Sequence, residues 1–362
     1  MTVSHKNFND LNDTSKKTLI KYIIFTLIFI SISVLSFIGI YELISDRSLF
    51  LSLKVFSQKA LIRVLFLMGI YYLLDALRLY YVLKALNVKI NFLFIFKIVF
   101  INIFVSNITP FATGGGFAQI YFLNKKGVSI GDASAASLIR TVIPIIFFIV
   151  TVPLILIFDM NYSSIIPNRF PNVLALFFIG VYLVIIYLGF QMIKNPVVIE
   201  RLIHKFLSFL KKKHVLKEEK YQHYKQKIDS EIDKLSSNIK NYLKGEKRYV
   251  ILSLFFTVLF LISLFYFSVI LIKDLNGDVS TVKILLSQLI VTFMMYFAPT
   301  PGATGVAEGG FTLMFSRYVS SKSIVSLIFA WRLFSIYVAM VIGMLLFYYH
   351  FLKNRKSKQR SL

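Results

Sequence analysis

Long apolar runs separated by short polar segments dominate the pattern along the chain. A run of about 18 residues or more is long enough to cross the hydrocarbon core of a bilayer as a helix. Two further apolar stretches are interrupted by Pro, Gly and Thr. The pattern predicts spanning helices at 19–41, 61–83, 133–158, 171–193, 249–273 and 323–350, and broken segments at 92–124 and 281–318.

The two interruptions share one short motif. "NITPFATGGGFAQ" begins at Asn107, "APTPGATGVAEGG" begins at Ala298, and both contain Thr-Pro-x-Ala-Thr-Gly, starting at Thr109 and Thr300. Proline stops a helix because it lacks an N–H, and glycine permits tight turns and close backbone approach. We therefore expect each broken segment to be a re-entrant helical hairpin, or a tilted pair of short helices.

The repeat continues beyond the motif. Ser-Leu-Ile follows each copy, at 137–139 and 326–328, and an arginine stands 30 or 31 residues after the motif proline, at Arg140 and Arg332. An in-register arginine makes coincidence a poor explanation for the shared motif. We expect one all-α membrane domain over 1–362, with a first repeat at 61–158 and a second at 249–350.

Positive charge predicts how the chain is oriented, because Lys and Arg concentrate in cytoplasmic loops. The segment 194–248 carries fifteen Lys or Arg against seven Asp or Glu, and the tail after 352 adds five basic residues. Both termini and this segment are expected in the cytoplasm, although the basic residues of loop 42–60, expected outside, fit this orientation poorly. The first broken segment then enters from the cytoplasm and the second from outside, which is an inverted-topology repeat with about six full spans and two hairpins, or about eight spans if the hairpins cross.

Composition excludes a soluble protein. Hydrophobic residues make up 57% of the chain and charged residues 16%, whereas soluble domains have roughly 45–50% and 25%. We attribute the net charge of +24 to basic loops that orient the protein in the membrane and contact anionic lipid, rather than to nucleic-acid binding. Within 194–248, apolar residues recur at helical spacing over 199–210 and again over 221–242, which predicts two amphipathic helices.

Candidate binding residues come from the broken segments and from charges inside the spans. Non-helical backbone at membrane depth is tolerated where it is buried or lines a wet cavity, and ionisable residues within spans are functional candidates. Two structural explanations are alternatives to binding. The glycines can serve only to let the hairpins pack closely, and Asp75 and Arg78 can form a salt bridge with each other. We expect the substrate-binding residues to be Thr109, Pro110, Thr113, Gly114, Gly115, Gly116, Gln119, Arg140, Thr300, Pro301, Gly302, Thr304, Gly305, Glu308, Arg332, Asp75 and Arg78.

Specific roles follow from the chemistry of these side chains. Thr113 and Thr304 can cap the short helices that follow them, so that the helix N-termini face an anionic group. Asp75 and Glu308 would balance the charge of the arginines. The five His residues lack metal-ligand spacing, Cys is absent, and no GxSxG motif occurs. We expect no catalytic residue, no metal and no cofactor.

The two motif stretches and the arginine-bearing spans after them resemble the lysylphosphatidylglycerol synthase transmembrane-region family, over about 19–350. That family includes the flippase domain of the multiple peptide resistance factor, and the resemblance implies a plasma-membrane protein that moves a lipid between leaflets. Relatives also carry a soluble aminoacyl-transferase domain, whereas this chain ends twelve residues after its last expected span. We therefore expect no lysyltransferase activity.

The leading functional hypothesis is translocation of an anionic or aminoacylated phospholipid, a glycolipid or a polyprenyl-phosphate lipid. The alternatives are a membrane enzyme of the phosphatidylglycerol lysyltransferase family and a permease for a small solute. The expected partners are the lipid substrate and an anionic lipid surface, with a second copy of the chain or a separate lipid-modifying enzyme as further candidates.

Overall fold

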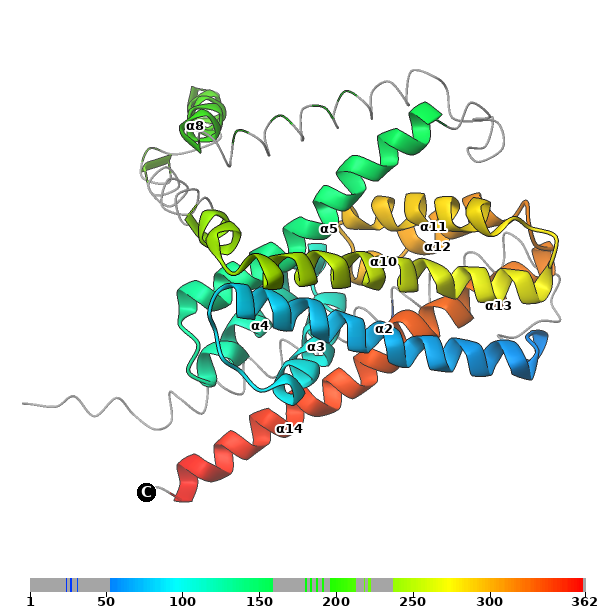
Figure 1. Cartoon of the computed structure of the whole chain (residues 1–362), viewed down its shortest axis with the longest axis horizontal. Helices are drawn as coiled ribbons and strands as arrows, with labels where there is room; N and C mark the ends of the chain where they lie inside the picture. Colours follow the sequence, from blue (N-terminus) through cyan, green and yellow to red (C-terminus); the bar gives the residue numbers. More distant parts are fainter. Residues whose placement is uncertain are drawn as a thin grey trace, which may run out of the picture. The chain divides into compact units, whose positions relative to one another are not determined.

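The computed structural model describes residues 53–158, 196–212 and 237–360, together with a few scattered positions. Every regular element within these ranges is a helix, and none of them is a strand (Figure 1). The elements are η1 (Leu53–Val55), α2 (Gln58–Ala85), α3 (Phe92–Asn107), η2 (Pro110–Ala112), α4 (Thr113–Lys125), α5 (Ile130–Phe158), α8 (Pro196–Lys212), α10 (Lys247–Leu275), α11 (Thr281–Tyr296), η3 (Pro301–Ala303), α12 (Val306–Phe315), α13 (Ser321–Arg332), η4 (Leu333–Tyr337) and α14 (Val338–Arg360).

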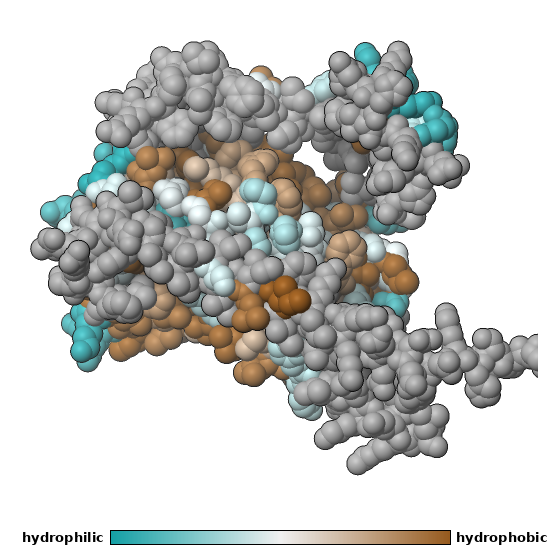
Figure 2. Space-filling view, turned by 180° about the vertical axis from the view of Figure 1, so that it is seen from behind, coloured by the Kyte–Doolittle hydropathy of each residue, from teal (hydrophilic) through white to brown (hydrophobic). Residues whose placement is uncertain are grey.

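Four helical segments are long and apolar enough to cross a membrane, and they confirm four of the six predicted spans. The remaining two predictions, 19–41 and 171–193, lie almost entirely outside the described residues. Much of the coloured surface in Figure 2 is hydrophobic, and exposed side chains such as Ile62 and Phe66 suit contact with lipid. The four segments are Gln58–Ala85, Ile130–Val152, Lys247–Leu275 and Ser323–His350.

Both predicted broken segments are indeed broken. Each contains a 16-residue apolar helix, α3 or α11, followed by a three-residue 3-10 turn and a shorter helix, α4 or α12. The helices α11 and α12 pack side by side as a hairpin (Figure 1). The prediction of interrupted helices at 92–124 and 281–318 is therefore confirmed at the level of the backbone.

The order of elements repeats along the chain. A long helix, a 16-residue helix, a 3-10 turn and a short helix occur as α2, α3, η2 and α4, and again as α10, α11, η3 and α12. A long helical segment follows each set: α5 after the first, and α13, η4 and α14 after the second. The sequence motif is thus embedded in a larger repeated succession of helices.

Contacts divide the chain into two compact units. The first comprises the described residues of Met1–Met68, Lys97–Gln119 and Phe265–Leu362, and the second those of Gly69–Phe96 and Ile120–Leu264. Both copies of the motif belong to the first unit. Asp75, Arg78 and Arg140 belong to the second.

Helices α2 and α10 run antiparallel (Figure 1). Within the first unit, the backbone N–H and hydroxyl of Ser57, just before α2, donate to the carboxylate of Asp274 near the end of α10, at 2.7 and 2.5 Å. Within the second unit, Tyr81 near the end of α2 stacks on Phe256 in the first half of α10, with ring centroids 5.2 Å apart. The equivalent long helices of the two repeats therefore point in opposite directions.

Local sequence explains where α2 and α4 end. Asn87 and Gly127 follow these helices with positive φ values of 59° and 89°. The next residue then donates its N–H to the carbonyl five residues earlier, at 2.9 Å for Val88 and 3.2 Å for Val128. This arrangement is a Schellman cap, which Gly and Asn favour because they tolerate the left-handed conformation.

The basic segment 194–248 contains helix α8, as the apolar spacing over 199–210 predicts. Residues 237–244 are also helical, whereas most of the second predicted helix, 221–242, lies outside the described residues. Lys211 Nζ lies 2.6 Å from Glu218 Oε2, and this hydrogen bond holds the pKa of the Glu218 carboxyl below its ordinary value. Exposed Arg201 and Lys205 on α8 remain available to an anionic surface.

Candidate functional site

The first motif forms the junction between α3 and α4. The N–H of Ala112 donates to the carbonyl of Thr109 at 3.2 Å, and the N–H of Thr113 donates to the carbonyl of Pro110. Phe111 and Ala112 have φ values of 54° and 53°, a left-handed conformation that residues other than glycine rarely adopt. The chain therefore makes a tight, constrained turn at this point.

The second motif repeats this turn. The N–H groups of Ala303 and Thr304 donate to the carbonyls of Thr300 and Pro301, both at 3.1 Å. Gly302 and Ala303 again have left-handed φ values, 61° and 55°. Two short stretches that share the motif, 191 residues apart, thus have the same two backbone hydrogen bonds and the same left-handed conformation at their third and fourth residues.

The two turns lie against each other in the first unit, with Cα atoms of η2 and η3 within 8 Å. Their exposure differs. Pro110, Phe111 and Thr113 are exposed, whereas Pro301 and Thr304 are buried. The paired turns bring together polar backbone groups and threonine hydroxyls from both copies of the motif.

The prediction that Thr113 and Thr304 cap the following helices is wrong. Each hydroxyl instead donates to the carbonyl of the motif proline, at 3.1 Å from Thr113 to Pro110 and at 2.7 Å from Thr304 to Pro301. The reason is the 3-10 turn, which brings the carbonyl three residues back within reach of the hydroxyl. These hydroxyls are therefore occupied within the motif.

Different side chains bind the N–H groups at these helix starts. Thr109 Oγ1 accepts from the N–H of Gly114 at 3.0 Å, and a carboxylate oxygen of Glu308 accepts from the N–H of Gly305 at 2.7 Å. Thr300 donates to the carbonyl of Thr304 at 2.7 Å, so it closes its own turn. The two motifs share a turn but differ in how the next helix begins.

A buried ion pair holds the second motif. Arg332 Nε and Nη2 lie 2.8 and 2.7 Å from Glu308 Oε1, and Arg332 Nη2 donates to the carbonyl of Gly302 at 3.0 Å. Both charged side chains are fully buried. Arg332, on α13, is thereby tied to the turn itself and to the first turn of α12.

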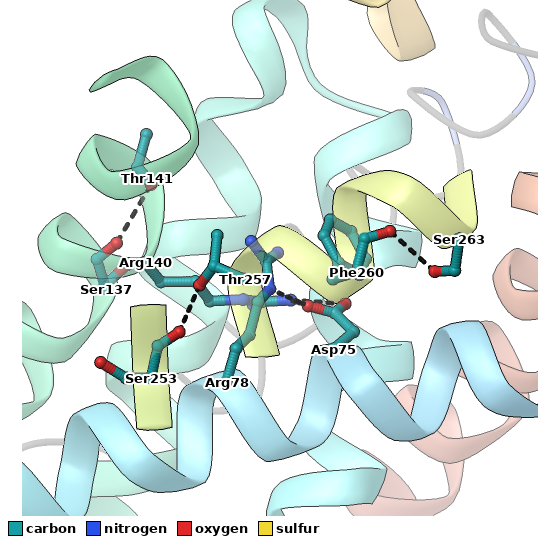
Figure 3. Close-up of polar contacts among 9 residues, drawn as sticks. All are labelled: Asp75, Arg78, Ser137, Arg140, Thr141, Ser253, Thr257, Phe260 and Ser263. Carbon is teal, nitrogen blue, oxygen red and sulfur yellow. Dashed lines mark hydrogen bonds and ion pairs between the residues drawn. The ribbon is translucent and has the colours of Figure 1, made fainter. Parts of the chain in front are cut away.

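A second buried ionic cluster lies in the second unit and joins α2 to α5 (Figure 3). Arg78 Nε lies 2.5 Å from Asp75 Oδ1, and Arg140 Nη2 lies 2.8 and 2.7 Å from the two oxygens of Asp75. The Arg78 guanidinium also stacks on the ring of Phe260 in α10, with Cζ 3.9 Å from the ring centroid. The Asp75–Arg78 salt bridge considered from sequence is present, and Arg140 joins it.

Both carboxylates therefore lie against the arginines that they were expected to balance. The sequence did not indicate which carboxylate pairs with which arginine, nor the roles of the Gly302 carbonyl and the Phe260 ring. Sequence reasoning also missed the hydroxyls of Ser253, Thr257 and Ser263, which α10 brings to this region and which bond to carbonyls within α10 (Figure 3). The Ser253 hydroxyl also bonds to the hydroxyl of Tyr242. Only the cluster of Ser and Thr in an otherwise apolar span could have indicated them.

Two of the motif glycines are required by packing. A Cβ atom on Gly115 would overlap Ser106 Oγ and lie 2.9 Å from the backbone carbonyl oxygen of Asn102 on α3. A Cβ atom on Gly114 would lie 2.6 Å from Thr109 Cγ2. The explanation that these glycines allow close helix packing thus holds at 114 and 115, where α4 approaches α3 closely.

The remaining candidates have different surroundings. Gln119 is buried on α4, and Gly116 is half-buried. A cavity of about 320 Å³ in the second unit contains none of the candidates and is lined by residues that include Asp132 and Lys244. Within the described ranges, no group of three His, Asp or Glu is placed to hold a metal ion.

Comparison with known proteins places the sequence of this chain in a wider group. The family model for the lysylphosphatidylglycerol synthase TM region matches residues 19–343. A UPF0104 membrane protein of Archaeoglobus fulgidus is 26% identical over 303 residues, which cover 83% of this chain and 89% of that protein. A UPF0104 membrane protein of Pyrococcus horikoshii is 26% identical over 291 residues, covering 76% and 81%.

Proposed function

Because the chain belongs to the lysylphosphatidylglycerol synthase transmembrane-region family and is a multi-pass membrane protein, we propose that it is a lipid translocase. Its substrate is a phospholipid, a glycolipid or a polyprenyl-phosphate lipid, whose head group crosses while the acyl chains stay in lipid. The observation that carries this proposal is the pair of similar turns that break two apolar helices and lie against each other.

Broken helices favour transport for a physical reason. A continuous helix satisfies its own backbone groups in lipid, whereas a turn at membrane depth is tolerated where protein buries it or where it lines a wet cavity. Transporters commonly use such interruptions at the interface of two inverted repeats to bind their substrate. The paired motifs match this arrangement in number and in mutual contact.

The direction of the helices adds support for inverted repeats. Equivalent helices of two inverted repeats point in opposite directions across the membrane, and α2 and α10 are antiparallel. The repeats proposed at 61–158 and 249–350 contain these helices at equivalent places. In this topology the termini and α8 face the cytoplasm of a cell whose plasma membrane holds the protein.

Buried charge adds a further argument. Ionisable side chains inside spans mark substrate or ion pathways, and the two repeats supply Arg140 and Arg332 at corresponding positions. Each arginine is held by a carboxylate rather than turned to lipid. We expect the polar head group to pass near these groups.

A leaflet assay in proteoliposomes tests this function. The purified protein is reconstituted with labelled phosphatidylglycerol, its lysyl ester, a glycolipid or a polyprenyl phosphate, and the fraction of label reaching the other leaflet is followed over time. Translocation of at least one lipid is expected. The Arg140→Leu variant should lose it, because Asp75 then keeps Arg78 as a neutral pair but the cluster lacks the guanidinium that α5 supplies.

Two controls make this test specific. Arg63→Leu removes an exposed arginine from the same helix as Asp75 and should leave translocation unchanged. A labelled small solute, enclosed in the same vesicles, should stay inside. Release of the solute without movement of any lipid would contradict the proposal and favour the permease alternative.

A further inference from the structure

A cavity of about 320 Å³ lies in the second unit at a place where three elements meet. Its walls come from the end of α2 and the turn after it, from the first turn of α5, and from the end of the helix at 237–244. Four polar side chains are among those that line it: Asn87, Asp132, Asn241 and Lys244. Sites for small molecules begin at roughly 300 Å³, so this volume admits a small metabolite.

Defined contacts hold the walls of this cavity. Gly245 lets the chain after the 237–244 helix come against the end of α2, since a Cβ atom there would lie 2.1 Å from the carbonyl oxygen of Ala85. Tyr242 is buried, and its hydroxyl bonds to Ser253 Oγ on α10 at 2.5 Å. The last helical residues of the basic segment are therefore fixed to both α2 and α10.

Opposite charges line the cavity without pairing with each other. Asp132 Oδ2 accepts from the hydroxyl of Ser129 at 2.6 Å, and the N–H of Asp132 donates to that hydroxyl at 3.0 Å. This reciprocal cap fixes the carboxylate at the start of α5 and uses one of its oxygens. Among the described residues, no salt bridge joins Asp132 to Lys244. A carboxylate oxygen and an ammonium group therefore remain available to a ligand.

We infer that this cavity binds a free amino acid, a small molecule that carries both an ammonium and a carboxylate group. The ammonium meets Asp132 and the carboxylate meets Lys244. The side-chain amides of Asn87 and Asn241 offer both donors and acceptors to the rest of the ligand. Lys244 repels a simple cation and Asp132 repels a simple anion, whereas a zwitterion attracts both. This site goes beyond the proposed transport function and does not rest on it.

A ligand in this cavity touches three helix ends at once. It contacts the turn after α2, the first turn of α5 and the segment that leads into α10, and so ties them together. A ligand that binds only this folded arrangement stabilises it. Bound amino acid should therefore raise the melting temperature and slow amide hydrogen exchange at 85–88 and 241–245. In the proposed topology this end faces the cytoplasm, so the occupant is a cytoplasmic amino acid.

Titration in detergent tests this inference without any transport measurement. Saturation-transfer NMR on the purified protein gives dissociation constants for free alanine, glutamate and lysine. The same measurement is made for propionate and ethylamine, each of which carries only one of the two charges. At least one of the amino acids should bind about tenfold or more tightly than propionate and ethylamine, since each of these two probes lacks one charged hydrogen bond.

Variants of the two charged residues should change selectivity in opposite ways. Asp132→Asn should remove the advantage of the amino acid over propionate, because a neutral amide no longer attracts the ammonium. Lys244→Gln should remove its advantage over ethylamine. Glu246→Gln and Lys247→Gln are exposed controls outside the cavity lining and should bind as the natural protein does. Melting temperatures identify a variant that fails to fold, and the exposed Lys244→Gln then carries the comparison.

Several results would overturn the inference. Amino acids that bind no more tightly than propionate and ethylamine would show that the cavity does not recognise both charges. Folded variants of Asp132 and Lys244 that keep the natural selectivity would place the ligand elsewhere, as would hydrogen exchange that slows only outside 85–88 and 241–245. Selective binding by a protein that moves no lipid in the leaflet assay would leave this site in place and contradict only the proposed transport function.

Discussion

Arg140 Nη2 lies 2.7 Å from one carboxylate oxygen of Asp75 and 2.8 Å from the other, across 65 residues of sequence. This contact ties α5 to α2 in the interior of the second unit. Asp75 also accepts from Arg78, one turn further along α2. A single carboxylate therefore holds two guanidinium groups, which makes it the most sensitive point of the cluster.

The first prediction concerns the stability of this cluster. Asp75→Ala removes the carboxylate that both buried guanidinium groups contact, and we expect it to lower the free energy of unfolding by about 3–5 kcal/mol. Arg78→Gln leaves the Asp75–Arg140 pair in place and should lower it by much less. Unfolding of both variants in detergent, followed by circular dichroism, measures the difference. Equal losses would show that Asp75 does not organise the cluster.

The second prediction concerns the Glu308–Arg332 pair. Glu308→Leu and Arg332→Leu each leave one buried charge unpaired, so each should destabilise the protein by about 3–5 kcal/mol. The double variant removes both charges and should be more stable than the sum of the single losses predicts, by about 1–3 kcal/mol. Unfolding free energies of the four proteins give this coupling. Strictly additive losses would mean that the pair makes no net contribution.

The third prediction concerns the close approach of α4 to α3. Gly115→Ala places a methyl group on Ser106 and on the Asn102 carbonyl, and we expect a loss of about 1–3 kcal/mol from overpacking. Gly69 in α2 has nothing within 4 Å of its missing Cβ atom. Gly69→Ala is therefore the matched control and should stabilise its helix, by about 0.5–1 kcal/mol.

A rescue variant sharpens this comparison. Adding Ser106→Ala to Gly115→Ala removes the hydroxyl but leaves the Asn102 carbonyl 2.9 Å from the new methyl group. The melting temperature should then recover only in part. Full stability of Gly115→Ala on its own would contradict the close packing of these helices.

The fourth prediction concerns orientation in the membrane. The chain contains no cysteine, so single cysteines can report accessibility without background. Asp278→Cys lies in the short turn between α10 and α11 and should react with an impermeant maleimide on intact cells. Lys211→Cys at the end of α8 should react only after the membrane is permeabilised. The opposite labelling pattern would reverse the proposed topology.

Much of the helical framework can be predicted from local patterns. A span such as α10 is a long apolar run with no internal breaker, so its length and composition alone indicate a membrane helix. The breaks after α3 and α11 follow from proline and glycine at known positions. The Asp75–Arg78 contact was also predictable, because residues three apart lie on one face of a helix.

The partners of the buried arginines depend on tertiary structure. Arg140 and Arg332 stand at matching places in the repeated sequence, yet one shares Asp75 with a second arginine and the other binds Glu308 and the Gly302 carbonyl. Local pattern carries no information about which helix faces another across 65 residues, since that is decided by how whole helices pack. The same holds for the contact between the two motif turns.

The threonine hydroxyls show the limit on a smaller scale. The motif predicts a helix break followed by a helix start, and in both copies the chain follows that prediction. Which hydrogen bond Thr113 or Thr304 makes depends on the left-handed residues before it, which bring the proline carbonyl within reach of the hydroxyl. Short-range chemistry thus determines where helices start and stop, whereas the packed structure determines which polar groups are left free to meet a substrate.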